Sequence, residues 1–200
     1  MSFLYDPAGN RKYLTVSERT AFLAAAGGLP QPARVFCRTL AFTGARISEV
    51  LSLTPRQIDA AAGVAIFECL KRRRRGVFRA VPIPADLIDE LRQLSTENHA
   101  KDGFDIEADR LWSWSRTTGW AQVKRAMAHA GLAGSQASPK GLRHGFAVAA
   151  LHAGVPVTTV KKWLGHARLS TTEIYTNAVG QEEQALAKRF WTTFRLDSEK

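Results

Sequence analysis

The residues best able to do chemistry are concentrated in one stretch of the chain, between Ser138 and Thr176. This stretch contains cationic groups, groups that transfer protons and one phenolic hydroxyl: Lys140, Arg143, His144, His166 and Tyr175. A guanidinium can hold the non-bridging oxygens of a phosphate, a tyrosine hydroxyl can attack phosphorus, and lysine or histidine can move a proton. Together with a second arginine, these groups are sufficient to break a phosphodiester bond without a metal ion.

Two more candidates lie earlier in the chain. Arg46 follows the helix-ending signal of Gly44 and stands one helical turn before Glu49. Lys71 opens a block of consecutive cations that continues with Arg72, Arg73, Arg74 and Arg75. Like charges repel unless an anion screens them, and duplex DNA presents a charge about every 1.7 Å of its axis, so this block predicts DNA binding rather than a solvated turn. Since an ammonium can lose its proton and a guanidinium effectively cannot, Lys71 is the best proton donor of the block.

Each candidate also has an ordinary structural explanation. Arg46 could pair with Glu49, and Arg143 could lie along the surface of its helix. His166 could bind the last carbonyls of the preceding helix, and Tyr175 could be a packed tyrosine with a satisfied hydroxyl. The sequence contains no HExxH motif, carboxylate cluster or glycine-rich phosphate loop, so it predicts neither a metal nor another cofactor.

Local signals predict helices around the C-terminal candidates. Ser138 followed by Pro139 predicts the start of a helix that ends near Gly154. A second, short helix is expected over 158–164 and ends at Gly165. Downstream, a capping box at residues 170–173 predicts a third helix that carries Tyr175 in its first turns.

The upstream half alternates between helical and strand patterns. A capping box of Thr15 and Glu18 predicts one helix, and a second apolar helix over 33–43 is expected to end at Gly44. A third helix begins near Arg46.

Two β-like runs, at 64–70 and 77–83, flank the basic block and predict an antiparallel hairpin. Beyond it, we expect a helix over 84–94, a surface loop over 95–109, and a helix that Thr117 or Thr118 caps.

The bulk composition fits one domain of mainly helical α+β class with a small antiparallel sheet. The chain has 200 residues, of which 45% are hydrophobic, and its formal charge is +10. Such a charge favours a polyanionic partner, with nucleic acid ahead of an acidic membrane surface. Cys37 and Cys69 lie in apolar surroundings without metal-ligand spacing, which favours reduced thiols and a cytoplasmic protein. The sequence shows neither a membrane-spanning run nor the apolar core of a signal peptide.

Four motifs in this order resemble the tyrosine recombinase, or phage integrase, family over residues 15–176. TGARISEVLSL resembles its first arginine motif, LKRRRRGVFRAVPIP its lysine-bearing hairpin, GLRHGFAVAALHAGV its second arginine motif, and LGHARLSTTEIYT the motif that ends on the nucleophile. The resemblance implies the catalytic-domain fold of DNA breaking-rejoining enzymes. It also implies the catalytic residues Arg46, Lys71, Lys140, Arg143, His166 and Tyr175, with Glu49 and His144 in support.

The resemblance implies a site-specific DNA recombinase that acts through a 3′-phosphotyrosyl intermediate in integration, excision or inversion. Its expected partner is a double-stranded recombination site, on which the protein forms a homotetramer while remaining a monomer when free. The source would be bacterial, or a phage or mobile element. The alternatives are DNA relaxation of the type IB topoisomerase kind and a DNA-binding accessory protein without activity.

Two features depart from the family pattern. Lys140 stands where the family most often has histidine, and an ammonium can stabilise a phosphate but is not a neutral base. Only about fourteen residues precede the catalytic domain, as in the short single-domain members that invert fimbrial promoter switches, unless the sequence is a fragment. The expected organisation is a flexible arm over 1–14, the catalytic domain over 15–180, and a helix over 181–200. This helix could fold back on its own domain, but the resemblance suggests that it docks on a neighbouring protomer.

Overall fold

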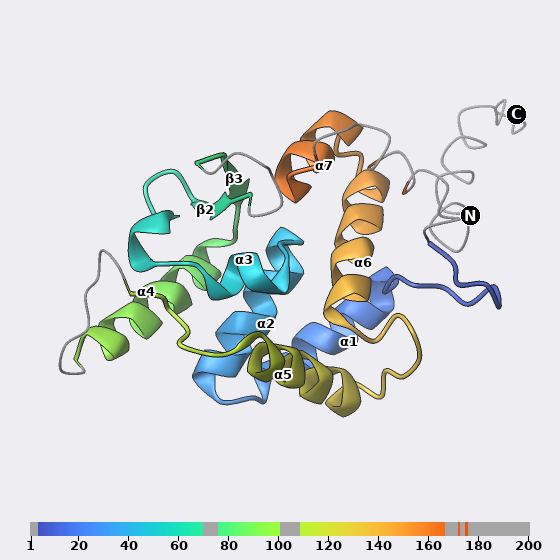
Figure 1. Ribbon diagram of the computed structural model, residues 1–200, viewed down its shortest axis with the longest axis horizontal. Coiled ribbons are helices and arrows are strands. Elements are labelled where there is room, and N and C mark those ends of the chain that lie inside the picture. The colour runs from blue at the N-terminus through green and yellow to red at the C-terminus, as the bar shows by residue number, and fades with distance from the viewer. Residues whose placement is uncertain (1–3, 70–75, 101–108, 167–171, 173–174, 176–200) are drawn as a thin grey trace, which may run out of the picture.

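The described part of the chain folds into a group of helices with a small sheet at one side (Figure 1). The computed structural model describes residues 4–69, 76–100, 109–166, 172 and 175. The elements are α1 Val16–Gly27, α2 Gln31–Thr43, α3 Ile47–Leu51, the 3-10 turn η1 Pro55–Gln57, β1 Ile58–Asp59, β2 Val64–Glu68, β3 Phe78–Pro82, α4 Ala85–His99, α5 Arg116–His129, α6 Pro139–His152 and α7 Val157–Leu164. The predicted mainly helical class with a small antiparallel sheet is confirmed.

Local capping interactions set several of the predicted helix ends. Thr15 and Glu18 form the expected capping box at the start of α1, with the Thr15 N–H donating to Glu18 Oε2 at 2.7 Å. Ser138 Oγ accepts from the backbone N–H three residues on at 3.1 Å and begins α6. Gly44 and Gly165 end α2 and α7 with φ of +59° and +67°, a backbone region that favours glycine.

The sheet has the order β1-β2-β3, and both pairings are antiparallel. The predicted hairpin of β2 and β3 is confirmed, with Val64 opposite Pro82 and Glu68 opposite Phe78. The short strand β1 was not predicted. Residues 70–75, which include Lys71 and the four arginines, lie outside the described residues.

The helix α4 is longer than the sequence pattern predicted. The apolar pattern ends at Leu94, but the helix continues through His99, and one face of its last part is buried by polar side chains. Ser95 and Asn98 face inward, and Asn98 Nδ2 donates to the carbonyl of Leu111 at 3.0 Å. The first part of the expected surface loop is therefore helix.

The start of α5 also differs from the prediction. Ser115 is its N-cap, and the Ser115 Oγ accepts from the Thr118 N–H at 3.0 Å. The helix consequently begins at Arg116, before the two threonines that were expected to cap it.

The N-terminal segment packs against the rest of the chain. A β-bridge joins Tyr5 to Arg11, and Leu4, Tyr13 and Leu14 are buried. The described part of the expected loose arm thus contributes side chains to the core.

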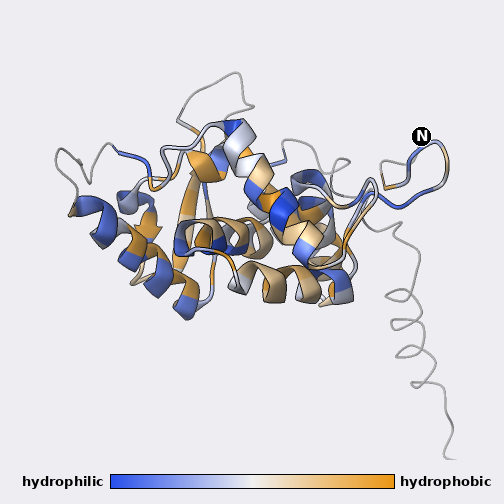
Figure 2. Cartoon of the chain, turned by 90° about the horizontal axis from the view of Figure 1, so that it is seen from below, coloured by the Kyte–Doolittle hydropathy of each residue, from blue (hydrophilic) through white to orange (hydrophobic). Residues whose placement is uncertain are grey.

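Two hydrophobic clusters stabilise the arrangement. The larger one joins α1, α2, α4 and α5 to the sheet, and the smaller one gathers Leu4, Tyr13, Phe146, Val148, Val160, Leu164 and Tyr175. In Figure 1, α3 lies between the sheet and α6, with α7 next to α6. Figure 2 shows hydrophobic residues on the strands and central helices and hydrophilic residues along outer helical turns. Within the described ranges, no helix is both long and apolar enough to cross a membrane.

Candidate active site

Three helix termini and one helix interior bring the predicted arginines and histidines together. Arg46 is the N-cap of α3, just after α2 ends, and Arg143 lies within α6. His166 follows Gly165, which ends α7. The Nη2 of Arg143 lies 3.1 Å from the Nε2 of His166, so residues far apart in sequence share one site.

Arg143 is fixed by backbone carbonyls at two helix ends. Its Nη1 donates to the carbonyl of Gly44 at 2.7 Å, and its Nη2 donates to the carbonyl of Leu164 at 2.8 Å. Burial, followed by the charge of Arg46, lowers the pKa of Arg143 to about 10, so the group remains a cation at neutral pH. These bonds orient the guanidinium before any ligand arrives.

Glu49 organises the cations of the site. Its Oε1 accepts from Arg46 Nη1 at 2.8 Å, and its Oε2 accepts from the Arg46 N–H and from Arg79 Nη2, each at 2.7 Å. Arg143 Nη1 lies 4.0 Å from the same Oε2. Burial raises the pKa of Glu49, but Arg79 and Arg46 outweigh that effect and hold it below its ordinary value. The ion pair considered for Arg46 therefore forms within the site.

Arg79 is a site residue that the sequence analysis missed. Its side chain is 4% exposed, and its Nε donates to the carbonyl of Trp163 at 2.6 Å. It thereby joins β3 to α3 through Glu49 and to α7 through Trp163. The alternation of buried and exposed positions along β3 could have identified it, because Arg79 and Val81 share the inward face. A buried arginine needs an anionic partner.

His166 uses both ring nitrogens. Because an arginine can only donate, His166 Nε2 accepts from Arg143, which leaves the proton on Nδ1 to be donated to Thr172 Oγ1 at 2.9 Å. Burial, followed by the charges of Arg143 and Arg46, lowers the pKa of His166 to about 3. The imidazole is therefore neutral at pH 7. Thr172, a second residue that the sequence analysis missed, fixes the ring.

Tyr175 lies between two histidines. Its Oη is 2.8 Å from the Nδ1 of His144, and its ring stacks on that of His166 with centroids 6.2 Å apart. Burial raises the pKa of Tyr175, and the charges of Arg143 and Arg46 partly offset this effect. Since the side chain is 2% exposed, the hydroxyl is held in a buried setting next to the cations.

The predicted site residues fall into three groups. One group is assembled in the structure: Arg46, Glu49, Arg143, His144, His166 and Tyr175. Lys140 lies exposed in the first turn of α6, one turn before this assembly. The predicted proton donor Lys71 and the DNA-binding block at 72–75 fall outside the described residues.

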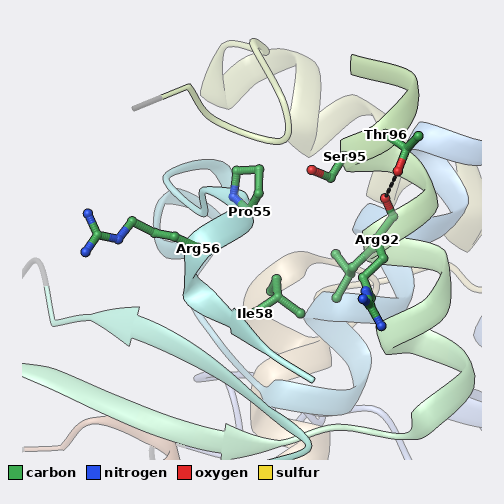
Figure 3. Close-up of a pocket in the computed structure, with 7 residues that line it drawn as sticks. Pro55, Arg56, Ile58, Arg92, Ser95 and Thr96 are labelled. Atoms are coloured by element: carbon green, nitrogen blue, oxygen red, sulfur yellow. Dashed lines mark hydrogen bonds between the residues drawn. The ribbon is translucent and has the colours of Figure 1, made fainter. Parts of the chain in front are cut away.

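A pocket of about 310 Å³ opens beside the assembly. Lys161, Lys162, Arg79 and His166 contribute basic side chains to its wall. Another pocket, of about 300 Å³, lies between η1 and α4 (Figure 3). Its described lining is formed by Pro55, Arg56, Ile58, Leu91, Arg92, Ser95 and Thr96, none of which is a predicted site residue. The lysines of α7 make the pocket beside His166 suited to an anionic ligand, and this pocket adjoins the assembled site residues.

Sequence comparison relates the chain to known recombinases. The profile of the Phage integrase family matches residues 12–182. The chain is 30% identical over 173 residues to tyrosine recombinase XerA of Thermococcus kodakarensis and 34% identical over 200 residues to tyrosine recombinase XerD of Xanthomonas axonopodis pv. citri. These alignments cover 85% and 90% of this chain but 59% and 63% of the relatives. The chain thus spans about three fifths of their length.

Structural comparison supports the same fold. The crystal structure of XerA recombinase superposes with a TM-score of 0.75 at 21% identity, covering 92% of this chain and 65% of that one. The catalytic domain of bacteriophage HP1 integrase gives a TM-score of 0.60 at 24% identity, covering 88% and 93%. The structure of XerH bound to its difH substrate gives a TM-score of 0.72 at 22% identity, covering 91% of this chain and 58% of that one.

Proposed function

The chain belongs to the phage integrase family, and on that premise we propose that it is a site-specific DNA recombinase. It cleaves and rejoins DNA through a bond between Tyr175 and a 3′ phosphate. The observation that carries this proposal is the convergence of Arg46 and Arg143 on Glu49, with Tyr175 stacked on the histidine that Arg143 binds. A hydroxyl and two fixed guanidiniums within one buried cluster suit attack on a phosphodiester.

The side chains divide the reaction between them. Arg46 and Arg143 hold the non-bridging oxygens of the scissile phosphate, and each such preorganised donor is worth about 3 kcal/mol in comparable sites. Tyr175 Oη attacks the phosphorus in line, and the bond from phosphorus to the 5′ oxygen breaks. Lys71 protonates the departing 5′ oxygen. The tyrosyl ester conserves the phosphodiester bond energy, so a new 5′ hydroxyl can reverse the step.

His166 and Lys140 assist the phosphate clamp. Neutral His166 has its Nε2 occupied by Arg143 in the free protein, and an incoming phosphate competes for that guanidinium. The negative charge of the phosphate favours protonation of the His166 ring, which then donates a hydrogen bond to a phosphate oxygen. Lys140, exposed at the start of α6, adds a positive charge from the solvent side.

Double-stranded DNA is the proposed partner. The formal charge of +10, the basic block at 71–75 and the lysines of α7 beside the pocket support binding to a polyanion. The solved XerH complex contains the difH substrate of that protein. By analogy, residues 15–180 form a catalytic domain that binds half of a recombination site, and four protomers assemble on two sites.

Covalent capture tests the proposal and also supplies a substrate. The full chain is incubated with a pool of duplexes that carry randomised flanks and a nick, so that the short 5′-hydroxyl strand released by cleavage diffuses away. Wild type should form an adduct that survives denaturing detergent, and Tyr175→Phe should form none. Absence of a wild-type adduct, or an adduct in Tyr175→Phe, rejects the proposal. The most strongly captured duplex becomes the substrate for the experiments below.

Docking of residues 181–200 on a neighbouring protomer has its own test. Deletion from Gln181 onward should leave a protein that still forms the covalent adduct but recombines two sites poorly, because the protomers no longer engage each other. Gel analysis of adducts and of recombinant products measures the two activities separately. Unaltered recombination by the truncated chain would reject docking in trans.

A further inference from the structure

The hydroxyl of Tyr175 is held by His144, which has no part in the reaction described above. The Nδ1 of His144 lies 2.8 Å from Tyr175 Oη, and the two ring centroids are 5.4 Å apart. His144 is 8% exposed and Tyr175 is 2% exposed. A short hydrogen bond between two buried rings requires that the groups match as donor and acceptor.

The surroundings indicate which group donates. Arg143 and Arg46, whose positive charges act on Tyr175, can only donate hydrogen bonds. Among the described residues, His144 Nδ1 is the hydrogen-bond partner of Tyr175 Oη, so we assign it as the acceptor of the phenolic hydrogen, with the single ring proton of neutral His144 on Nε2. In this tautomer the histidine is positioned to take the proton from the nucleophile.

The other candidate bases in the motif are already excluded or engaged. His166 accepts from Arg143 through Nε2 and donates to Thr172 through Nδ1. Lys140, which stands where the family most often has histidine, is exposed in the first turn of α6, and a lysine ammonium offers three donors and no acceptor. Among the described residues, His144 is thus the base in hydrogen-bonding contact with Tyr175 Oη.

The electrostatic setting keeps His144 unprotonated in the free protein. Burial lowers the pKa of His144 to about 4. The positive charges of Lys140 and Arg143 on α6, and of Lys12 on the N-terminal segment, act in the same direction. A docked phosphodiester places negative charge against the same cations, which opposes their effect and makes the ring a better proton acceptor during the reaction.

We propose that His144 is the general base of the cleavage step. This inference rests on the proposed function. As the bond from Tyr175 Oη to phosphorus forms, the hydroxyl proton moves to His144 Nδ1, and the bond to the 5′ oxygen breaks. The 5′ oxygen receives a separate proton from the donor assigned to Lys71. In religation, the new 5′ hydroxyl attacks phosphorus and gives its proton back to the group assigned to Lys71. The bond from phosphorus to Tyr175 Oη breaks, and the imidazolium of His144 returns its proton to Tyr175 Oη.

Single-turnover cleavage of the captured duplex tests the role of His144. General base catalysis contributes about 100-fold or more, so His144→Gln and His144→Ala should cleave at least about 100-fold more slowly. Added imidazole should accelerate His144→Ala at least about tenfold, whereas pyrrole, a ring of similar size without a basic nitrogen, should not. A duplex with sulfur in place of the bridging 5′ oxygen should restore the cleavage rate of Lys71→Ala, because a thiolate leaves without a proton. The same duplex should not restore the cleavage rate of His144→Gln.

Controls separate this inference from the proposed function. His99→Gln, at an exposed histidine on α4, should cleave like wild type. Thermal unfolding and a DNA mobility shift verify that each variant folds and binds, and His144→Gln serves alone if His144→Ala does not fold. Cleavage by His144→Gln within threefold of wild type would overturn the role. The role would also be overturned if imidazole failed to accelerate His144→Ala or if pyrrole accelerated it equally. Restored cleavage of the sulfur substrate by His144→Gln would overturn it as well. Failure of wild type to form any adduct would instead reject the recombinase proposal itself.

Discussion

At the scale of single residues, the site is defined by an excess of buried positive charge. Glu49 is the described carboxylate that pairs with both Arg46 and Arg79, and Arg143 lies 4.0 Å from it. Among the described residues, three guanidiniums around one carboxylate leave an excess of two positive charges. A phosphodiester that develops a second negative charge in its transition state would balance them, which supports the proposed phosphoryl transfer.

Replacing Arg143 by lysine should show how much depends on the shape of the guanidinium rather than on its charge. A lysine keeps the cation but cannot reach the carbonyls of Gly44 and Leu164 and a phosphate together. We expect Arg143→Lys to cleave the captured duplex at least about 100-fold more slowly, with DNA affinity changed far less. Single-turnover kinetics and a mobility shift measure the two quantities. A cleavage rate within tenfold of wild type would show that charge alone suffices.

At the scale of elements, local signals predicted most helix boundaries and the β2–β3 hairpin. Capping groups such as Thr15 and Ser138 act within one turn, and the left-handed glycines 44 and 165 end helices by their own conformation. The last turn of α4 could not be predicted this way, because its burial depends on Leu111, which lies in another segment. Sequence periodicity does not predict helix ends that depend on contacts with distant segments of the chain.

The same distinction applies to the site. Arg46, Arg143, His166 and Tyr175 were identifiable because their motifs are contiguous in sequence. Arg79 was not, because its partners come from two other elements, the Glu49 carboxylate on α3 and a carbonyl of α7. Motif spacing thus identified the groups expected to touch the phosphate and missed the group that links the elements behind them.

The ion pair between Glu49 and Arg79 should be a major link between β3 and α3. Glu49→Gln leaves the Arg79 guanidinium buried beside a neutral amide, and breaking a buried pair in this way costs about 3–5 kcal/mol of unfolding free energy. Combining it with Arg79→Met should cost less than the sum of the single changes, because the stranded charge is removed. Urea unfolding measures all three variants.

The matched control for this pair is Asp86→Asn. Asp86 pairs with Arg38 at the surface, with its side chain 66% exposed, so its loss should cost less than about 1 kcal/mol. If Glu49→Gln lowered the unfolding free energy no more than Asp86→Asn, the buried pair would not hold β3 and α3 together.

At the scale of the whole molecule, burying neutral histidines makes stability depend on pH. The pKa of His144 falls from 6.5 to about 4, and that of His166 falls from 6.5 to about 3. Below pH 6.5 the unfolded chain binds protons on these rings and the folded chain does not, so the stability present above pH 6.5 is lost as the pH falls. The Glu49 carboxylate, whose pKa lies below 4.5, contributes in the same direction only at lower pH.

Thermal unfolding between pH 7 and pH 4.5 should reveal this linkage. The midpoint should fall steadily as the pH drops below about 6.5, and His144→Gln should flatten the slope because one buried ring no longer titrates. His99→Gln, at an exposed histidine, should leave the slope unchanged. A midpoint that stays constant over this range in wild type would contradict the buried neutral state of His144 and His166.

The identity of the residue bonded to DNA is the most direct test of the whole account. Digestion of the covalent adduct with trypsin should release a peptide spanning 169–188, in which Tyr175 is the one tyrosine. Mass spectrometry should find this peptide linked through Tyr175 to the 3′ phosphate of the captured strand, with a free 5′ hydroxyl on the released strand. Linkage to Tyr5, Tyr13 or any other residue, or to a 5′ phosphate, would contradict the assignment of Tyr175 as the nucleophile.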